Sequence, residues 1–299
     1  MHLASTRATR PRPGFRGFVI LPLLLLPLVG PGSARAKTWP ASEWVAIQEA
    51  LDSAAYGDTV LVAPGTYDRL VLRSGVTLMA EKGPEDTILR NGRFWVVKAE
   101  GVDSLAVLEG FTLDGIKASE GVAYLEESSL TIRHCVIKNG WSGVRALYSK
   151  PRIENCTIRD CQNGIYLYES EGLVLENDIQ LCLTAVNIVS SRSRILRNTI
   201  TRNSYGIQVS DHSQPAIGGS IASANRVWNN AAVAVKNTAY ITRNAVRTMQ
   251  PMTLEVPFNF WGTDCPDSSM FQGPVEFAPW VDESGTRSLR KCGAPAGGN

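Results

Sequence analysis

Histidine is scarce in this chain, which has 3 histidines in 299 residues. Only His134 and His212 follow the N-terminal region, at different repeat positions and without cysteine partners at metal-ligand spacing. We therefore expect no zinc or copper centre, and no metal site is predicted. The sequence also lacks a glycine-rich phosphate loop and a nucleophile elbow, so no cofactor is expected.

Long apolar runs are also missing after the N-terminus. One run, FVILPLLLLPLVG at 18–30, follows several arginines and precedes the small residues Ala34-Arg35-Ala36. This order is typical of a secretory signal peptide with its cleavage site. The run is too short for a membrane span, which needs roughly 20 apolar residues, and Pro22 and Pro27 interrupt it. We expect a protein without a membrane span, exported to the periplasm or the extracellular space.

The exported part lacks a large excess of either charge. Residues 1–36 contain five arginines and no acidic residue, and their removal leaves 25 basic and 28 acidic residues, a net charge of −3. A chain this close to neutrality has no strong field to attract nucleic acid or an anionic membrane. No nucleic-acid partner is expected.

A 21-residue repeat dominates the middle of the chain. Isoleucine or valine recurs at this interval in two series: Ile132, Ile153, Val174 and Ile195, then Ile137, Ile158, Ile179 and Ile200. Helix signals are absent from this part, and each unit contains three short strand-like segments. Such strands are stable only if each coil stacks on the last, about 4.8 Å away. The repeat predicts an all-β, parallel β-helix with three strands per coil, and the bias of crossover connections predicts a right-handed one.

Small polar residues and cysteines share further repeat positions. One position contains Cys135, Cys156, Asn177 and Asn198, so we expect a hydrogen-bonded column in which the cysteines are rungs. Stacked rungs hold their Cβ atoms near 4.8 Å, beyond the usual disulfide range of roughly 3.5–4.5 Å. Buried thiols are the favoured interpretation, although the redox state of Cys135, Cys156, Cys161 and Cys182 stays open. Cys265 and Cys292, outside the repeat, are the better disulfide candidates.

The ends of the coil differ from its middle. The segment ASEWVAIQEALDSAA places Ile47 and Leu51 on one helical face, with Ser42 as N-cap, and predicts a helix that covers the first coil. The expected segments are a signal peptide (1–36), an N-terminal capping helix (37–58), a parallel β-helix (59–250), a C-terminal coil and cap (251–282) and a flexible tail (283–299).

Three motifs resemble a known group. They are the entry IQEALDSAAYGDTVLVAPGTYDRLVLRSGVTLMAE, the repeats around NCTIRDCQNGIYLYES and the closing NFWG with GPVEFAPW. Together, over about residues 40–282, they are similar to right-handed parallel β-helix repeat proteins of the pectate-lyase-like superfamily. The resemblance implies the fold, but that superfamily includes lyases, hydrolases, esterases, epimerases, tailspikes and binding proteins.

The catalytic motifs of these branches are not complete here. The hydrolase pattern NTD…DD…GHG…RIK, the esterase segments QDTL and DFIFG, and the epimerase motif DPHE are absent. Asp160 and Asp178 occupy different columns, so they do not predict a pair of glycosidase carboxylates. Lys138 and Arg159 share an outward column without acidic neighbours in the repeat, which indicates solvated surface charge. Catalytic residues are therefore unknown.

Outward residues of the third strand form the one candidate ligand site. This column is flanked by Trp141, Tyr148 and Tyr168, and consists of Arg145, Tyr166, Asn187 and Gln208. Aromatic faces with amide and guanidinium donors, repeated along a flat sheet, suit an extended glycan. They also suit an ordinary solvated strand. The favoured hypothesis is a binding protein for polysaccharide or another extended ligand. A polysaccharide lyase or hydrolase and a structural or protein-interaction module are the alternatives, and the oligomeric state is left open.

Overall fold

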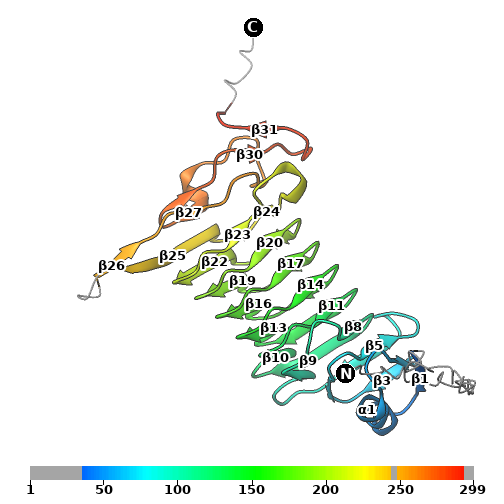
Figure 1. Cartoon of the computed structure of the whole chain (residues 1–299). Coiled ribbons are helices and arrows are strands. Elements are labelled where there is room, and N and C mark those ends of the chain that lie inside the picture. The colour runs from blue at the N-terminus through cyan, green and yellow to red at the C-terminus, as the bar shows by residue number, and fades with distance from the viewer. Residues whose placement is uncertain (1–35, 244–247, 293–299) are drawn as a thin grey trace, which may run out of the picture. The chain divides into compact units, whose positions relative to one another are not determined.

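The computed structural model describes residues 36–243 and 248–292. These residues wind into a parallel β-helix whose coils each contribute strands to three sheets, called here sheets A, B and C (Figure 1). The predicted signal peptide, residues 1–36, lies outside the described ranges except for Ala36, so its presence stays an expectation.

Sheet A contains the first strand of each coil, and its strands pair in parallel with the coils on either side. Its strands are β1 (Thr38–Ala41), β2 (Thr59–Val62), β5 (Thr77–Ala80), β8 (Val107–Glu109), β11 (Thr131–Arg133), β14 (Arg152–Glu154), β17 (Leu173–Leu175), β20 (Arg194–Leu196) and β23 (Ala216–Ile217).

Sheet B contains the second strands and sheet C the third. Sheet B consists of β3 (Gly65–Tyr67), β6 (Thr87–Arg90), β9 (Thr112–Ala118), β12 (Val136–Gly140), β15 (Thr157–Arg159), β18 (Asp178–Gln180), β21 (Thr199–Thr201) and β24 (Arg226–Trp228). The parallel strands of sheet C are β4 (Leu70–Val71), β7 (Val97–Glu100), β10 (Ala123–Glu126), β13 (Ser142–Leu147), β16 (Asn163–Tyr168), β19 (Thr184–Val189), β22 (Tyr205–Asp211), β25 (Val233–Arg243) and β28 (Phe271–Gln272).

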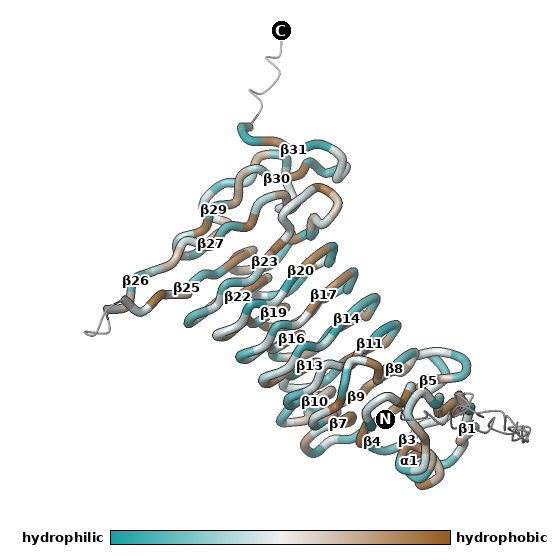
Figure 2. The backbone as a smooth tube through the Cα atoms, viewed as in Figure 1, coloured by the Kyte–Doolittle hydropathy of each residue, from teal (hydrophilic) through white to brown (hydrophobic). Residues whose placement is uncertain are grey.

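The register confirms the 21-residue repeat. Ile153 pairs with Ile132 on one side and with Val174 on the other, and Ile158 pairs in the same way with Ile137 and Ile179. All six side chains have no exposed surface, so the two series form continuous columns inside the coil. Along the tube, apolar and polar colour alternates within the strands (Figure 2), as expected when successive side chains face the interior and the solvent.

Polar ladders run through the bends of successive coils. The amide oxygen of Asn198 accepts the backbone N–H of Asn177 at 2.9 Å, and its amide nitrogen donates to Val174 O and Leu196 O. At another bend, Ser170 Oγ accepts the N–H of Ser149 at 3.1 Å. These residues are buried, so the ladders supply hydrogen-bond partners that water cannot provide.

The N-terminal end is covered as predicted by a helix, α1 (Trp44–Ser53), and Ile47 and Leu51 face the core. Its N-cap is Glu43 without a side-chain hydrogen bond, so the prediction that Ser42 caps the helix was wrong. The predicted capping segment at 37–58 also contains β1, which pairs in parallel with β2. The first coil therefore begins before the helix.

The C-terminal end is less regular than the predicted boundaries imply. In β25, the residues up to Ala239 pair in parallel with β22, whereas Tyr240–Arg243 pair antiparallel with β26 (Thr248–Pro251). The remaining elements are η1 (Ile221–Ser223), β27 (Leu254–Glu255), η2 (Ser268–Met270), β29 (Val275–Glu276), β30 (Trp280–Val281) and β31 (Ser288–Leu289).

The expected flexible tail, residues 283–299, contains structure in its first part. Strand β31 pairs antiparallel with β30, and Cys292 forms a disulfide with Cys265. Residues 293–299 lie outside the described ranges. Among the described residues, no helix is long and apolar enough to cross a membrane.

Candidate functional site

The predicted outward column forms an unbroken row on sheet C. Arg145 pairs with Tyr166, Tyr166 with Asn187, and Asn187 with Gln208, each on the adjacent coil. The residues on either side of each one point inward and are buried, such as Ile165 and Leu167 beside Tyr166. The four column side chains are half-buried because each lies against its neighbours along the row.

The same row continues at both ends. Tyr124 pairs with Arg145 at one end, and Lys236 pairs with Gln208 at the other. The Arg145 guanidinium lies 5.8 Å from the Tyr166 ring, and Lys236 Nζ lies 5.5 Å from the Tyr205 ring. Cations in contact with aromatic faces keep these side chains flat on the sheet. We call this row, from Tyr124 to Lys236, the sheet C row.

Two polar atoms of the sheet C row have no hydrogen-bond partner among the described residues. They are Arg145 Nε and Asn187 Oδ1, and neither has appreciable exposed surface. Arg145 Nη1 still donates to Glu120 O at 3.4 Å, and Asn187 Nδ2 donates to Asn163 Oδ1 at 3.1 Å. Buried polar atoms without partners are costly to the fold, and because these two have no exposed surface they are not contact points for a ligand in this conformation.

Burial also shifts the ionisation of the tyrosines in this row. Burial raises the pKa of Tyr166, although the Arg145 guanidinium partly opposes the shift. Burial and a hydrogen bond to Glu126 raise the pKa of Tyr124 to about 12. Both phenols are therefore neutral donors at physiological pH.

A groove of about 1280 Å³ lies at the bend where each coil passes from sheet B to sheet C, just before the strands that carry the sheet C row. Trp141, Gln162, Leu183 and Ser204 line it, and each immediately precedes a strand of sheet C. The groove therefore crosses successive coils parallel to the sheet C row. Asn163, at the start of β16, follows this lining and contacts Asn187, which links the groove edge to the row.

Large apolar side chains are exposed along the groove. Trp141 is 56% exposed, and Ile116, Leu181 and Leu183 are exposed to a similar degree. Basic residues from the same coils, Lys117 and Arg202 among them, also line it. A groove with apolar walls and a few charged groups is a typical binding site for an organic ligand.

An insertion in β9 contributes Ile116 and Lys117 to the lining of the groove. Opposite β12 the register jumps from Asp114 to Ala118 while β12 advances only from Lys138 to Gly140, so β9 bulges. Within this bulge Ile116 and Lys117 have φ values of 40° and 71°. A β-branched residue with positive φ is strained, and such strain clusters at functional sites.

Asp114 is a buried carboxylate at this end of the groove. Its Oδ2 accepts a hydrogen bond from Arg90 at 3.1 Å, and its Oδ1 accepts one from Asn139 at 2.8 Å. Lys138 Nζ lies 3.8 Å from Oδ2. Burial alone would raise the pKa of Asp114, but the hydrogen bonds and the two cations outweigh it and lower the pKa. Asp114 is therefore ionised at neutral pH.

This cluster corrects one sequence prediction. Lys138 and Arg159 do share a column, but Asp114 occupies the same column one coil earlier, so Lys138 has an acidic neighbour. The 21-residue repeat did not indicate this acidic neighbour, because Arg90, Asp114 and Lys138 are spaced at 24 residues. The irregular spacing at 88–131 was the signal that could have indicated a bulge.

The other candidate acids and histidines do not gather. Asp160 lies at the groove bend in an ion pair with Arg159, while burial raises the pKa of Asp178 on β18. His134 contacts Glu109, and His212 contacts Thr242. Within residues 36–243 and 248–292, no group of three or more His, Cys, Asp or Glu side chains is arranged to hold a metal ion.

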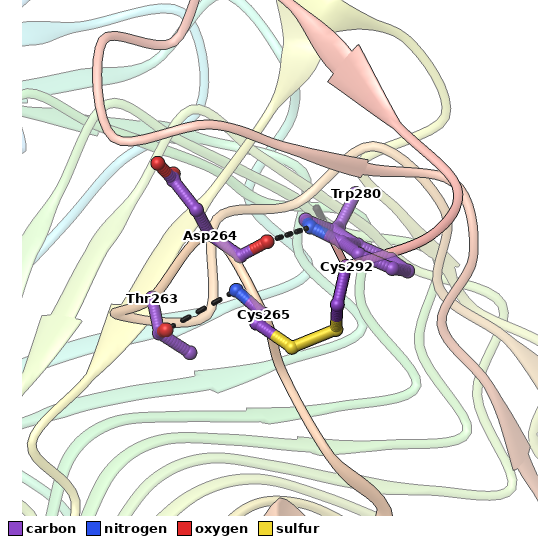
Figure 3. The surroundings of a disulfide bond; sticks show 5 residues. All are labelled: Thr263, Asp264, Cys265, Trp280 and Cys292. Atoms are coloured by element: carbon purple, nitrogen blue, oxygen red, sulfur yellow. Dashed lines mark hydrogen bonds between the residues drawn. A yellow bond between two sulfur atoms is a disulfide. The ribbon is translucent and has the colours of Figure 1, made fainter. Parts of the chain in front are cut away.

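Cys265 and Cys292 lie at the C-terminal end, away from the groove lining, and form a disulfide with a Cα–Cα distance of 4.9 Å. Figure 3 shows the bridge beside Trp280, whose indole nitrogen donates to Asp264 O at 3.1 Å. The bridge thus ties the end of the chain to the C-terminal cap. The other four cysteines are unbridged and buried.

Comparison with known proteins agrees with this fold. Residues 97–247 match the family model described as "Right handed beta helix region". No curated protein matches the chain.

Similar solved structures include three carbohydrate-active proteins. An alginate lyase from Paenibacillus sp. str. FPU-7 is 15% identical, with 80% of this chain and 99% of that chain covered and a TM-score of 0.41. A mannuronan C-5 epimerase A-module from Azotobacter vinelandii is 17% identical, with 80% and 86% covered and a TM-score of 0.42. A polygalacturonase from Erwinia carotovora ssp. carotovora is 14% identical, with 86% and 96% covered and a TM-score of 0.42.

Proposed function

We propose, from the premise that the chain belongs to the right-handed beta helix family, that it is an exported protein that binds polysaccharide. The binding surface is the sheet C row together with the groove beside it. Arg145, Tyr166, Asn187 and Gln208 supply the donors, acceptors and aromatic face. Export follows from the signal peptide expected at residues 1–36, and its destination is the periplasm or the extracellular space.

One observation supports this proposal more than any other. The sheet C row repeats polar and aromatic side chains once per coil, and a groove with exposed Trp141 runs parallel to it. A polymer of repeated sugar units meets equivalent groups at regular steps of about 4.8 Å along such a surface. Apolar sugar faces pack on aromatic rings while the hydroxyls form hydrogen bonds with amide and guanidinium groups.

Replacement of Tyr166 by alanine tests the surface directly. Tyr166 lies in the middle of the row and supplies its aromatic face, so Tyr166→Ala should weaken polysaccharide binding roughly tenfold, about 1.4 kcal/mol. Binding of the purified protein to a glycan array identifies the ligand first. Affinity electrophoresis or calorimetry then compares the variant with the wild type on that glycan.

Tyr56→Ala is the matched control, because Tyr56 is 63% exposed and lies before β2, outside the sheet C row and the groove lining. It should bind like the wild type. Equal affinity of Tyr166→Ala and wild type would eliminate the proposed surface. Circular dichroism establishes that both variants keep the fold.

Catalysis on a polysaccharide is the second candidate, and the Asp114 cluster favours it. A carboxylate, Lys138 and Arg90 gather at a strained bulge in the groove, and such groups suit acid–base chemistry. Incubation with a panel of polyuronates tests it. Absorbance of unsaturated products would indicate a lyase, whereas new reducing ends without this absorbance would indicate a hydrolase, and either result would replace the purely binding role.

A structural or protein-interaction module is the remaining alternative. Absence of binding to any glycan on the array, combined with co-purification of a protein partner, would favour it. Nucleic acid is not an expected partner because the exported part is close to neutral, with a net charge of −3.

A further inference from the structure

Two pairs of thiols occupy successive rungs of the polar ladders. Cys135 and Cys156 precede Asn177 in one ladder, and Cys161 and Cys182 precede Asn203 in the other. In both ladders the last cysteine donates its backbone N–H to the amide oxygen of the next asparagine, at 3.0 and 2.9 Å. The two pairs therefore have equivalent backbone positions, and any difference in their chemistry must come from the surroundings of the thiols.

The first difference is accessibility. Cys161 and Cys182 line the groove, with 6% and 4% of their surface exposed, whereas Cys135 and Cys156 do not line it. A solute in the groove can therefore contact only the Cys161–Cys182 pair.

The second difference is in the thiol hydrogen bonds. Cys135 and Cys156 each donate to a carbonyl of their own coil and approach one of the preceding coil, Leu108 O and Ile132 O respectively. Cys161 and Cys182 approach only Arg159 O and Gln180 O, two residues earlier in their own coil, within the described residues.

The spacing of the coils decides which bond Cys161 and Cys182 can form. Leu183 N donates to Cys161 O at 3.1 Å, so the two cysteines lie on adjacent coils in register. Parallel rungs hold Cβ atoms near 4.8 Å, which is too wide for a relaxed disulfide. Two metal–sulfur bonds of roughly 2.3 Å placed end to end span about 4.6 Å, which matches the spacing of the coils.

We propose that Cys161 and Cys182 form a two-coordinate site for a soft monovalent metal ion of the copper(I) class. Thiolates are the ligands such an ion prefers, and two in line satisfy it, whereas structural zinc needs four ligands. Binding converts two S–H groups and M⁺ into S–M–S with release of two protons and no change of oxidation state. The product carries one negative charge, and Lys117 and Arg202 line the same groove.

This site does not depend on polysaccharide binding. No metal site was predicted from the sequence, because that prediction rested on the few histidines and on the spacing of metal ligands along the chain. The thiol pair is created by stacking, since the two residues are 21 positions apart and meet only across coils.

The test uses copper(I) alone, under anaerobic conditions, on the full chain with its Cys265–Cys292 disulfide intact. Bicinchoninate competes for the ion and reports it by colour. The wild type should withhold one more equivalent of copper(I) than Cys182→Asn. Cys156→Asn is the matched control, because it also replaces the last cysteine before an asparagine rung, and it should withhold as much as the wild type. Equal withholding by wild type and Cys182→Asn, or equal loss in both variants, would overturn the proposal.

A measurement on the wild type guards against variants that do not fold. Iodoacetamide should label Cys161 and Cys182 in the native protein and leave Cys135 and Cys156 unlabelled, as mapped by mass spectrometry. One equivalent of copper(I) should protect the labelled pair. Absence of native labelling, or labelling unchanged by copper(I), would contradict the site.

Discussion

Individual buried side chains in this protein stabilise the fold through hydrogen bonds between coils. Asn198 is 1% exposed, and its amide bonds the backbone or side chains of the coils on both sides. An apolar column can be built from any residue of similar size, but an asparagine rung needs both its oxygen and its nitrogen. The ladders therefore specify the register in which coils stack.

Asn198→Ala should lower the free energy of unfolding by roughly 2–6 kcal/mol. Alanine leaves the N–H of Asn177 and the carbonyl of Val174 without these partners, at about 1–3 kcal/mol for each group. Urea unfolding followed by circular dichroism measures the change. Gln250→Ala, at an exposed position of β26, should change stability by less than about 0.5 kcal/mol. A loss at Asn198 no larger than this control would show that the ladder is not stabilising.

Asp114 makes stability depend on acid pH. Its pKa is lower in the folded protein than in the unfolded chain, so its contribution is present above about pH 4 and is lost as pH falls through the folded pKa. Asp114→Asn removes this titrating group. The wild type should therefore lose stability more steeply than the variant below about pH 4, as followed by thermal unfolding across pH. Parallel pH profiles would show that the carboxylate is not held ionised by Arg90 and Lys138.

At the level of elements, the two ends protect a stack whose edges would otherwise pair with other chains. Helix α1 covers the first coils with Ile47 and Leu51. At the other end, β30 and β31 form an antiparallel pair, and the Cys265–Cys292 disulfide ties the chain to this cap. Figure 1 shows these end elements at opposite ends of the coil.

Removal of this disulfide should destabilise the cap. The two cysteines are 27 residues apart, and closure of a loop of this length corresponds to roughly 3–4 kcal/mol in the chain-entropy description. The double variant Cys265→Ser/Cys292→Ser should therefore show faster hydrogen exchange in β30 and β31 and a lower melting temperature. Exchange in β16, in the middle of the stack, should stay slow because each coil contacts only its neighbours. Unchanged exchange at β30 and β31 would mean that the bridge does not hold the cap.

Sequence repetition predicted the regular elements but not the irregular ones. The coils from Ile132 to Ile200 were predictable because each interior position demands the same type of residue. The bulge at Ile116 and Lys117 breaks the 21-residue repeat. The pairing of Asp114 with Lys138 could therefore not be predicted from the repeat. The interval from Ile200 to Val227 is six residues longer than the repeat, and most of this excess follows β23, which pairs with β20 at a spacing of 22 residues.

The candidate site was predictable only as far as it follows the repeat. The register of Arg145, Tyr166, Asn187 and Gln208 follows from the strand alternation. The groove does not, because it depends on bend residues such as Trp141 and Leu181 being exposed rather than folded inward. Leu181 adopts a φ of 56°, a conformation uncommon for leucine that it shares with Asn139, Asp160 and Arg202 at the equivalent position of the neighbouring coils.

At the scale of the whole described unit, the parallel β-helix converts a sequence repeat into a linear surface. Its interior holds continuous columns of apolar side chains, and its exterior presents one outward polar or aromatic side chain per coil along the sheet C row. An extended ligand can therefore be bound by the sum of several weak, equivalent contacts. Affinity should grow with ligand length until the row is filled.

Calorimetric titration with fragments of increasing length from one polysaccharide is the most direct test of this claim. The sheet C row offers one outward side chain per coil, so the wild type should bind longer fragments more tightly and with favourable enthalpy. Arg145→Ala/Asn187→Ala should lose roughly tenfold or more in affinity for the longest fragment. Affinity that does not change with fragment length, or is the same in wild type and double variant, would contradict binding along the sheet C row.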